Sequence, residues 1–265
     1  MYAFKLHKPN SIADAARLLS ENDEASLLAG GQTLIPTLKQ RLANPSDLID
    51  LAAIAGLSGI TVGGGVVSIG AMTRHAVVAE SAAVRESIAA LAALAGGIGD
   101  PQVRNRGTMG GSVANSDPSA DYPAAVIALD ATVHTDRRKI AADDYFRGMF
   151  ETALQSGEIL TRIDFRIPDK AAYMKFPNPA SRYAVVGVFV AVFGNAVRVG
   201  VTGAGPCAFR AAGFERALAA QFSPAALDAI EVPYGNFNSD LHASAEYRAN
   251  LVKVMAKRAV AKIVG

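Results

Sequence analysis

The sequence has almost no cysteine and no tryptophan, and the first of these scarcities limits its chemistry. Its 265 residues include one cysteine, Cys207. A disulfide within the chain is therefore impossible, and so is an iron–sulfur cluster ligated by several of its own cysteines. Single cysteines are usually small buried apolar residues, and we expect this role for Cys207 rather than a reactive one.

The sequence also lacks an excess of one charge and a long apolar run. The 26 Lys and Arg residues nearly balance the 24 Asp and Glu residues, and no basic cluster alternates with aromatics, so we expect no nucleic-acid partner. The N-terminal segment has no apolar signal-peptide core. The longest apolar stretch, Ala184 to Phe193, is too short to cross a bilayer as a helix. We expect a cytoplasmic, globular protein without a membrane span.

The first 55 residues alternate between helix and strand patterns. Ser11 with Asp14 predicts a capped helix start, because apolar residues follow at positions 12, 15, 16 and 19. Short apolar runs predict strands over 26–29 and 47–51. A helix is expected over 36–42, with Pro36 near its first position.

From residue 56 onward the pattern changes, and Gly63 to Gly65 indicate a β-hairpin between two apolar runs. Thr73 is expected to cap a short helix. Residues 81–95 have strong helical propensity and an apolar face, so they predict one helix. Further along, the patterns predict a polar glycine-rich loop over 96–122, a helix over 123–129, and strands over 131–135 and 159–167.

Pro168 and Asp169 predict a domain boundary. Beyond it, a separate α+β layer is expected, because strand patterns are followed by helical ones. The predicted strands are 171–176, 184–193 and 196–202, and the predicted helices are 211–219, 224–230 and 245–263. The sequence therefore predicts an N-terminal domain over 1–168, with subdomains of about 1–55 and 56–168, and a C-terminal domain over 169–265.

Two glycine-rich segments carry the chemistry, and the first is Ala29-Gly30-Gly31-Gln32-Thr33-Leu34 between a strand and a helix. Paired glycines permit positive φ, so several backbone N–H groups can point into one phosphate-binding concavity. The Thr33 hydroxyl can donate a further hydrogen bond. An ordinary tight turn is the alternative. The segment is neither a P-loop nor a GxGxxG fingerprint.

The second segment runs from Asp100 to Asp121 and is rich in short polar side chains. A loop of this length is usually functional or disordered, and its apolar residues favour order. Its binding candidates are Thr108, Gly110, Gly111, Ser112 and Asn115. Asp121 can accept a hydrogen bond from a ribose or ribityl hydroxyl. Alternatively, Asp117 and Asp121 cap the helix at Pro123.

Two Gly-Gly loops suit a dinucleotide, because each can hold one side of a central pyrophosphate. Their spacing alone does not distinguish FAD from a sugar nucleotide. No Ser–His–Asp set is apparent, and the sequence predicts neither a catalytic residue nor a metal ligand. The four histidines are expected to be surface or packing residues; they are His7, His75, His134 and His242.

The two loops, AGGQTLIPTLKQRL and IGDPQVRNRGTMGGSVANSDPSADYPA, resemble those of the FAD-binding medium subunit of molybdenum hydroxylases. This family includes the flavoprotein subunits of carbon monoxide dehydrogenase and of xanthine-dehydrogenase-type enzymes. The resemblance extends over nearly the whole chain. It implies an α+β fold, namely a two-subdomain FAD-binding domain of the vanillyl-alcohol oxidase/p-cresol methylhydroxylase type followed by a small α+β C-terminal domain.

The resemblance also implies which residues bind non-covalent FAD. Residues 29–33 and 108–112 would wrap the pyrophosphate, Ile98 and Val103 would lie near adenine, and Asp121 near the sugar or ribityl hydroxyls. Lys175 and Tyr183 fall where the family lines the isoalloxazine. Tyr183 has an equally weighted alternative as a sheet-surface aromatic. Three positions depart from the family pattern, Met109, Ser112 and Asn115, and this leaves the exact contacts open.

The implied function is electron transfer within a complex. Electrons would pass from a molybdenum centre on a large subunit, through two [2Fe–2S] clusters on a small subunit, to FAD here and then to NAD, oxygen or a quinone. The competing interpretations are a self-contained FAD-dependent oxidoreductase on the same fold and a cofactor-free assembly subunit. The sequence does not indicate what the complex oxidises.

Overall fold

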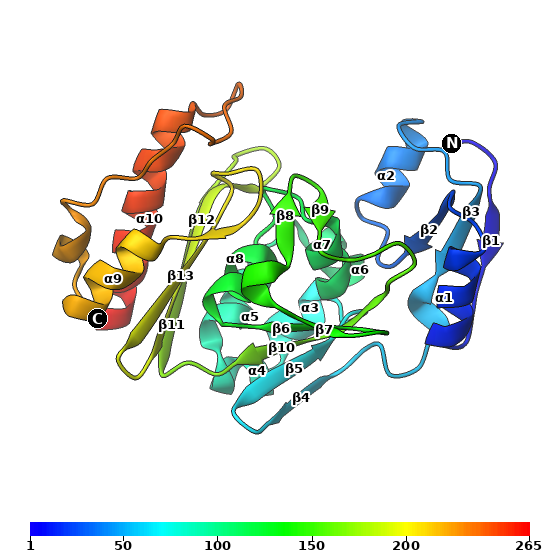
Figure 1. Ribbon diagram of the computed structural model, residues 1–265, viewed down its shortest axis with the longest axis horizontal. Coiled ribbons are helices and arrows are strands. Elements are labelled where there is room, and N and C mark those ends of the chain that lie inside the picture. The colour runs from blue at the N-terminus through cyan, green and yellow to red at the C-terminus, as the bar shows by residue number, and fades with distance from the viewer.

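The computed structural model describes residues 1–265 and has three parts arranged in a row (Figure 1). The N-terminal part lies at one end, a central sheet with its helices follows, and a second large sheet backed by a long helix lies at the other end. No helix combines the length and the apolar character needed to cross a membrane.

The N-terminal part is a three-stranded parallel sheet of order β1-β3-β2 (Lys5–His7, Asp47–Asp50 and Ala25–Leu28). Helix α1 (Ile12–Ser20) packs on it, and Ser11 caps this helix by accepting a 3.1 Å hydrogen bond from the Asp14 N–H, as predicted. Helix α2 (Leu34–Lys39) follows β2, and the short helix η1 (Leu51–Ala53) follows β3.

The central part is a five-stranded antiparallel sheet of order β4-β5-β10-β6-β7. Apolar side chains on one face of its strands pack against several short helices and form the largest core. The strands are Ile60–Gly63, Val66–Gly70, Leu160–Arg166, Thr132–Thr135 and Lys139–Ala141. The helices are α3 (His75–Glu80), α4 (Ala82–Ser87), α5 (Ala89–Gly96), α6 (Pro101–Arg106), α7 (Met109–Asn115) and α8 (Tyr122–Ala128). A 3₁₀ turn, η2 (Ala142–Asp144), precedes the small hairpin β8 (Phe146–Gly148) and β9 (Glu151–Thr152).

The C-terminal sheet is antiparallel, of order β11-β12-β13-β14 (Lys170–Pro177, Ala184–Phe193, Ala196–Thr202 and Phe209–Arg210). Because strand side chains alternate between faces, Val188 and Val190 of β12 pack beneath helix α10 (Ala245–Val264), whereas Phe189 faces the central core. Helices α9 (Ala212–Ala220) and η3 (Pro224–Leu227) complete this part. The sheet thus lies between two cores and fixes the C-terminal part against the central part.

The structure confirms the predicted hairpin at Gly63 to Gly65 and all three C-terminal strands, and it corrects several other predictions. Residues 81–95 form two helices rather than one, with a break at Ile88 (φ −143°). Because Val84, Ile88 and Leu91 are all buried in the central core, tertiary packing overrides the helical propensity of this stretch. Residues 224–230 form only the η3 turn. The predicted helix over 36–42 begins two residues earlier, so Pro36 is its third residue.

The segment 96–122, predicted as a loop, contains α6 and α7. Each helix begins at a capping side chain, since the Asp100 carboxylate accepts from the Val103 N–H (2.8 Å) and the Thr108 hydroxyl accepts from the Gly111 N–H (3.2 Å). Thr73 does not cap a helix. Its hydroxyl instead bonds the backbone N–H and carbonyl of Gly59 (3.0 and 3.1 Å), which ties α3 to the central sheet.

Candidate functional site

A single large cavity of about 970 Å³ opens between the N-terminal part, the α6–α7 segment and the turn before β12. Its volume is at the upper end of the range of about 300–1,000 Å³ for ligand pockets, which suits an extended ligand. Fifteen of the sixteen residues predicted to bind the cofactor line it. They are Ala29, Gly30, Gly31, Gln32, Thr33, Leu34, Ile98, Val103, Thr108, Gly110, Gly111, Ser112, Asn115, Asp121 and Tyr183. The sixteenth, Lys175, does not line the cavity; its ammonium contacts the carboxylate of Asp121, which does.

The first glycine loop presents a run of free backbone donors. None of the N–H groups from Ala29 to Leu34 donates a hydrogen bond within the protein; the first paired donor is the Ile35 N–H, which bonds the Gly31 carbonyl (3.0 Å). The Thr33 side chain makes no capping bond, so its hydroxyl is free as well. Successive unpaired N–H groups facing a cavity form an anion-binding nest, which is suited to a phosphate or diphosphate.

Each of the two positions in this loop requires glycine for a different structural reason. Gly31 has a φ of +72°, in the left-handed region that favours glycine. Gly30 is required by packing, because a Cβ there would lie 2.2 Å from the Arg106 carbonyl oxygen and 2.7 Å from the Gly107 Cα. The first loop therefore rests directly on the backbone that joins α6 to α7.

The second glycine pair is packed rather than open, so the two loops are not equivalent. The Gly110 N–H donates to the Ala71 carbonyl (2.8 Å), and the Gly111 N–H to the Thr108 hydroxyl (3.2 Å). A Cβ on Gly110 would lie 2.5 Å from the Ala71 Cβ. These N–H groups are engaged inside the protein, and among residues 108–112 only the Thr108 N–H lacks a partner. The Gly-Gly pair of this segment lets α7 approach the central sheet.

Asp121 links the cavity to the C-terminal sheet. It is 5% exposed, and its carboxylate accepts hydrogen bonds from the Tyr173 hydroxyl (2.5 Å) and the Lys175 ammonium (3.0 Å), both on β11. It makes no side-chain cap to α8, so the capping interpretation is wrong for this residue. Burial raises the pKa of the Asp121 carboxyl, and the Lys175 ammonium and Tyr173 hydroxyl oppose that shift. Lys175 also donates to the Gly97 carbonyl (3.0 Å) and has no place on the cavity surface.

A tight turn carries Tyr183 to the cavity edge, where the side chain is 45% exposed. The Asn178 side-chain carbonyl accepts from the backbone N–H groups of Ala180 (2.9 Å) and Ser181 (3.1 Å), and Arg182 takes a φ of +61°. Partial burial and the nearby carboxylates of Asp117 and Asp121 raise the pKa of the Tyr183 hydroxyl, which therefore stays protonated at neutral pH.

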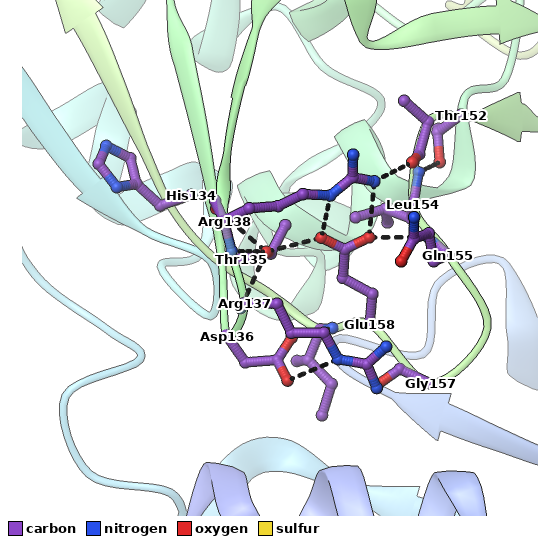
Figure 2. Close-up of polar contacts among 12 residues, drawn as sticks. His134, Thr135, Asp136, Arg137, Arg138, Thr152, Leu154, Gln155, Gly157 and Glu158 are labelled. Carbon is purple, nitrogen blue, oxygen red and sulfur yellow. Dashed lines mark hydrogen bonds and ion pairs between the residues drawn. The ribbon is translucent and has the colours of Figure 1, made fainter.

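Glu158 anchors the segment 154–160, several residues of which line the cavity. Its carboxylate receives two 2.9 Å bonds from Arg138 and one of 2.8 Å each from the Thr135 hydroxyl and the Gln155 N–H (Figure 2). The hydrogen bonds from Arg138 are the main reason that the pKa of Glu158 falls to about 2. The Glu158 side chain is fully buried by these partners, so it positions the wall rather than offering a free charge to a ligand.

Other lining residues were not predicted to bind a ligand, because they come from segments without a motif. They include Leu27, Leu51, Ala71, Met72, His75, Leu154, Glu158, Leu160 and Arg182, and only their tertiary placement identifies them. Thr37 and Asp117 also line the cavity; they lie within the two motifs but were not among the predicted binding residues. No group of three or more His, Cys, Asp or Glu side chains is arranged to hold a metal ion.

Comparison with known proteins agrees with this geometry. Residues 2–170 match the model of the FAD binding domain in molybdopterin dehydrogenase. The chain is 36% identical to the nicotine 6-hydroxylase medium subunit of Paenarthrobacter nicotinovorans, over 97% of this chain and 96% of that one. It is also 36% identical to the carbon monoxide dehydrogenase medium chain of Hydrogenophaga pseudoflava, with the same coverage of both chains. A solved structure of reconstituted CO dehydrogenase from Oligotropha carboxidovorans superposes with a TM-score of 0.90 at 35% identity, covering 99% of this chain and 98% of that one.

The fold and the site therefore define a flavoprotein with an FAD-binding domain. The chain belongs to the family of FAD-binding medium subunits of molybdenum hydroxylases and is an oxidoreductase subunit. This confirms the resemblance inferred from the two glycine loops, and it confirms the α+β fold class.

Proposed function

We propose that this chain is the electron-transfer subunit of a molybdenum hydroxylase, taking electrons from [2Fe–2S] clusters of a partner subunit and passing them to an external acceptor. The observation that carries the proposal is the cavity of about 970 Å³ with consecutive unpaired N–H groups along one wall. When bound, FAD accepts electrons singly and releases two, which joins one-electron carriers to a two-electron acceptor.

The first loop holds the diphosphate in this proposal. The N–H groups of Ala29 to Leu34 and the Thr33 hydroxyl donate to its oxygens, because no protein acceptor competes for them. Across the cavity, the donors are fewer, since the α7 backbone is already bonded to the sheet. Three groups remain there for ligand contact, namely the Thr108 N–H and the side chains of Ser112 and Asn115.

The remaining predicted residues divide between the two ends of the ligand. Ile98 and Val103 supply an apolar surface for adenine, and Tyr183 covers the isoalloxazine at the cavity edge. Asp121 accepts from a sugar or ribityl hydroxyl. Lys175 acts through Asp121, because its ammonium holds this carboxylate and does not reach the cavity surface.

Partners are part of the proposal. The names "medium subunit" and "medium chain" of the relatives support a multi-subunit complex. We propose a molybdenum-containing large subunit and a [2Fe–2S] small subunit as partners, and NAD, oxygen or a quinone as the acceptor. We also propose that the FAD-binding domain spans 1–168, with subdomains of about 1–55 and 56–168, and that 169–265 is the C-terminal domain. The family match over 2–170 supports this division.

The test is to purify the chain alone, add FAD, remove the excess, and record the visible spectrum together with identification of the released flavin. One FAD per chain, with no turnover until partner subunits are added, is the expected result. Turnover by the isolated chain would instead indicate a self-contained flavoenzyme. A folded chain that binds no FAD, alone or within the purified complex, would indicate a cofactor-free subunit and refute the proposal.

A further inference from the structure

His75 is a buried residue of the cavity wall that neither the sequence motifs nor the proposed function uses. It is the first residue of α3 and is 5% exposed, yet it lines the cavity. Its backbone N–H donates to the Gly107 carbonyl (3.0 Å). Its ring packs against Gly107: a Cβ added to Gly107 would lie 2.7 Å from the His75 Nε2. Gly107 therefore separates the His75 ring from Gly30 of the first loop.

The ring of His75 is buried without any hydrogen-bond partner in the protein. Its Nδ1 is fully enclosed and unpaired, and so is the hydroxyl of Tyr122, whose ring centre lies 5.4 Å from that of His75. No protein group bonds Nε2 either, but this nitrogen is not enclosed in the same way as Nδ1. Buried polar groups are nearly always hydrogen-bonded, so an unpaired imidazole that lines a cavity points to a ligand.

The chemistry of the ring decides what kind of ligand atom it meets. Burial and the nearby Arg104 lower the pKa of His75 to about 4, so the ring is neutral and carries one N–H near neutral pH. An enclosed N–H without an acceptor is rarer and costlier than an unpaired acceptor. The proton therefore belongs on Nε2, where a ligand can reach it, and Nε2 offers a donor that requires an acceptor oxygen.

We propose that the Nε2–H of His75 donates a hydrogen bond to an oxygen of the FAD diphosphate. His75 and the first loop both line the same cavity and both lie against Gly107, which supports this, because the loop's free N–H groups serve the same diphosphate. The inference rests on the proposed function, and it makes His75 a cofactor-binding residue that acts as a neutral donor rather than as a cation.

The test compares His75→Leu, which removes the donor, with His75→Gln, whose amide keeps an N–H at a similar reach. His134→Gln serves as the control, because His134 is also buried but bonds Asp164 instead of lining the cavity. Dissociation constants are measured for FAD, for ADP, which keeps the diphosphate, and for riboflavin, which lacks it. Circular dichroism checks the fold of each variant.

The expected result for His75→Leu is binding of FAD and ADP weakened about tenfold or more, with riboflavin unchanged. His75→Gln should stay within a few-fold of wild type, and the control should match wild type. Unchanged ADP binding in His75→Leu, or an equal loss for riboflavin, would overturn the inference. A wild-type chain that binds neither FAD nor ADP would instead overturn the proposed function, and the inference with it.

A measurement on the wild-type chain decides the question even if the leucine variant does not fold. Nitrogen-15 NMR of the histidine rings should show His75 neutral with its proton on Nε2, and ADP should shift the Nε2 resonance. A proton on Nδ1, or an Nε2 resonance that ADP leaves unchanged, would overturn the inference.

Discussion

Replacing Gly30 with alanine tests whether the two glycine loops form one rigid cradle. The added Cβ would lie 2.2 Å from the Arg106 carbonyl oxygen and 2.8 Å from its carbonyl carbon. Both atoms belong to the main chain, so no side-chain rotation relieves the clash, and the loops must move apart. Overpacking of this kind costs about 1–3 kcal/mol of folding free energy. Because the N–H groups of the first loop would be displaced, FAD binding should weaken by more than tenfold.

Gly63→Ala is the matched control. Gly63 ends a strand, has no positive φ, and a Cβ there would meet nothing within 4 Å. The free energy of unfolding of the Gly63→Ala variant should match that of wild type or rise slightly, and its FAD affinity should not change. Urea unfolding and FAD titration of wild type and both variants measure the two effects. The reasoning about the cradle is wrong if Gly30→Ala unfolds and binds FAD as Gly63→Ala does.

Three further predictions follow from other contacts. The hydrogen bonds from Arg138 depress the Glu158 pKa from 4.5 to about 2, so its stabilisation is present above pH 4.5 and is lost as pH falls toward 2. Glu158→Gln should cost about 2–3 kcal/mol near neutral pH and flatten the acid-dependent fall, as measured by urea unfolding between pH 2 and 7; an unchanged pH profile would contradict this. Lys175→Met should lower the unfolding free energy by about 3 kcal/mol or more, because it leaves the buried Asp121 carboxylate without a cation, and an unchanged urea midpoint would refute that role. Gly200→Ala should destabilise by about 1–3 kcal/mol, because its Cβ would lie 2.2 Å from a carbonyl oxygen of α8; a wild-type melting temperature would show that α8 and β13 can separate at little cost.

Local patterns predicted the elements whose signals are strong and self-contained. The Ser11 cap, the hairpin at Gly63 to Gly65 and the strands of the C-terminal sheet all appear where they were expected. Strand β10 also has its apolar side chains Ile163 and Phe165 fully buried on one face, as the alternation indicated. These features depend on side-chain capping, turn chemistry and two-residue periodicity, which neighbouring residues determine.

Predictions of secondary structure failed where tertiary packing opposed helical propensity, and where helix-capping residues lay in a glycine-rich segment. The break at Ile88 has no local signal, because each half of 81–95 is a good helix former. Helices α6 and α7 are short, and their glycine content suggested a loop, although Asp100 and Thr108 could have been identified as caps. Gly110 does line the cavity, and its close contact with Ala71 adds a packing reason for glycine that the sequence did not indicate.

The sequence by itself determined the family, the cofactor class and nearly all the predicted residues that meet around the cavity, because these depend on two contiguous motifs. Tertiary structure alone decided which role each motif has at the cavity. It left the N–H groups of the first loop free, engaged those of the second with the central sheet, and placed Lys175 behind Asp121. It also brought His75 beneath Gly107. Hydrogen-bond pairing and close backbone contacts between distant segments are set by how whole layers pack, and no local pattern encodes them.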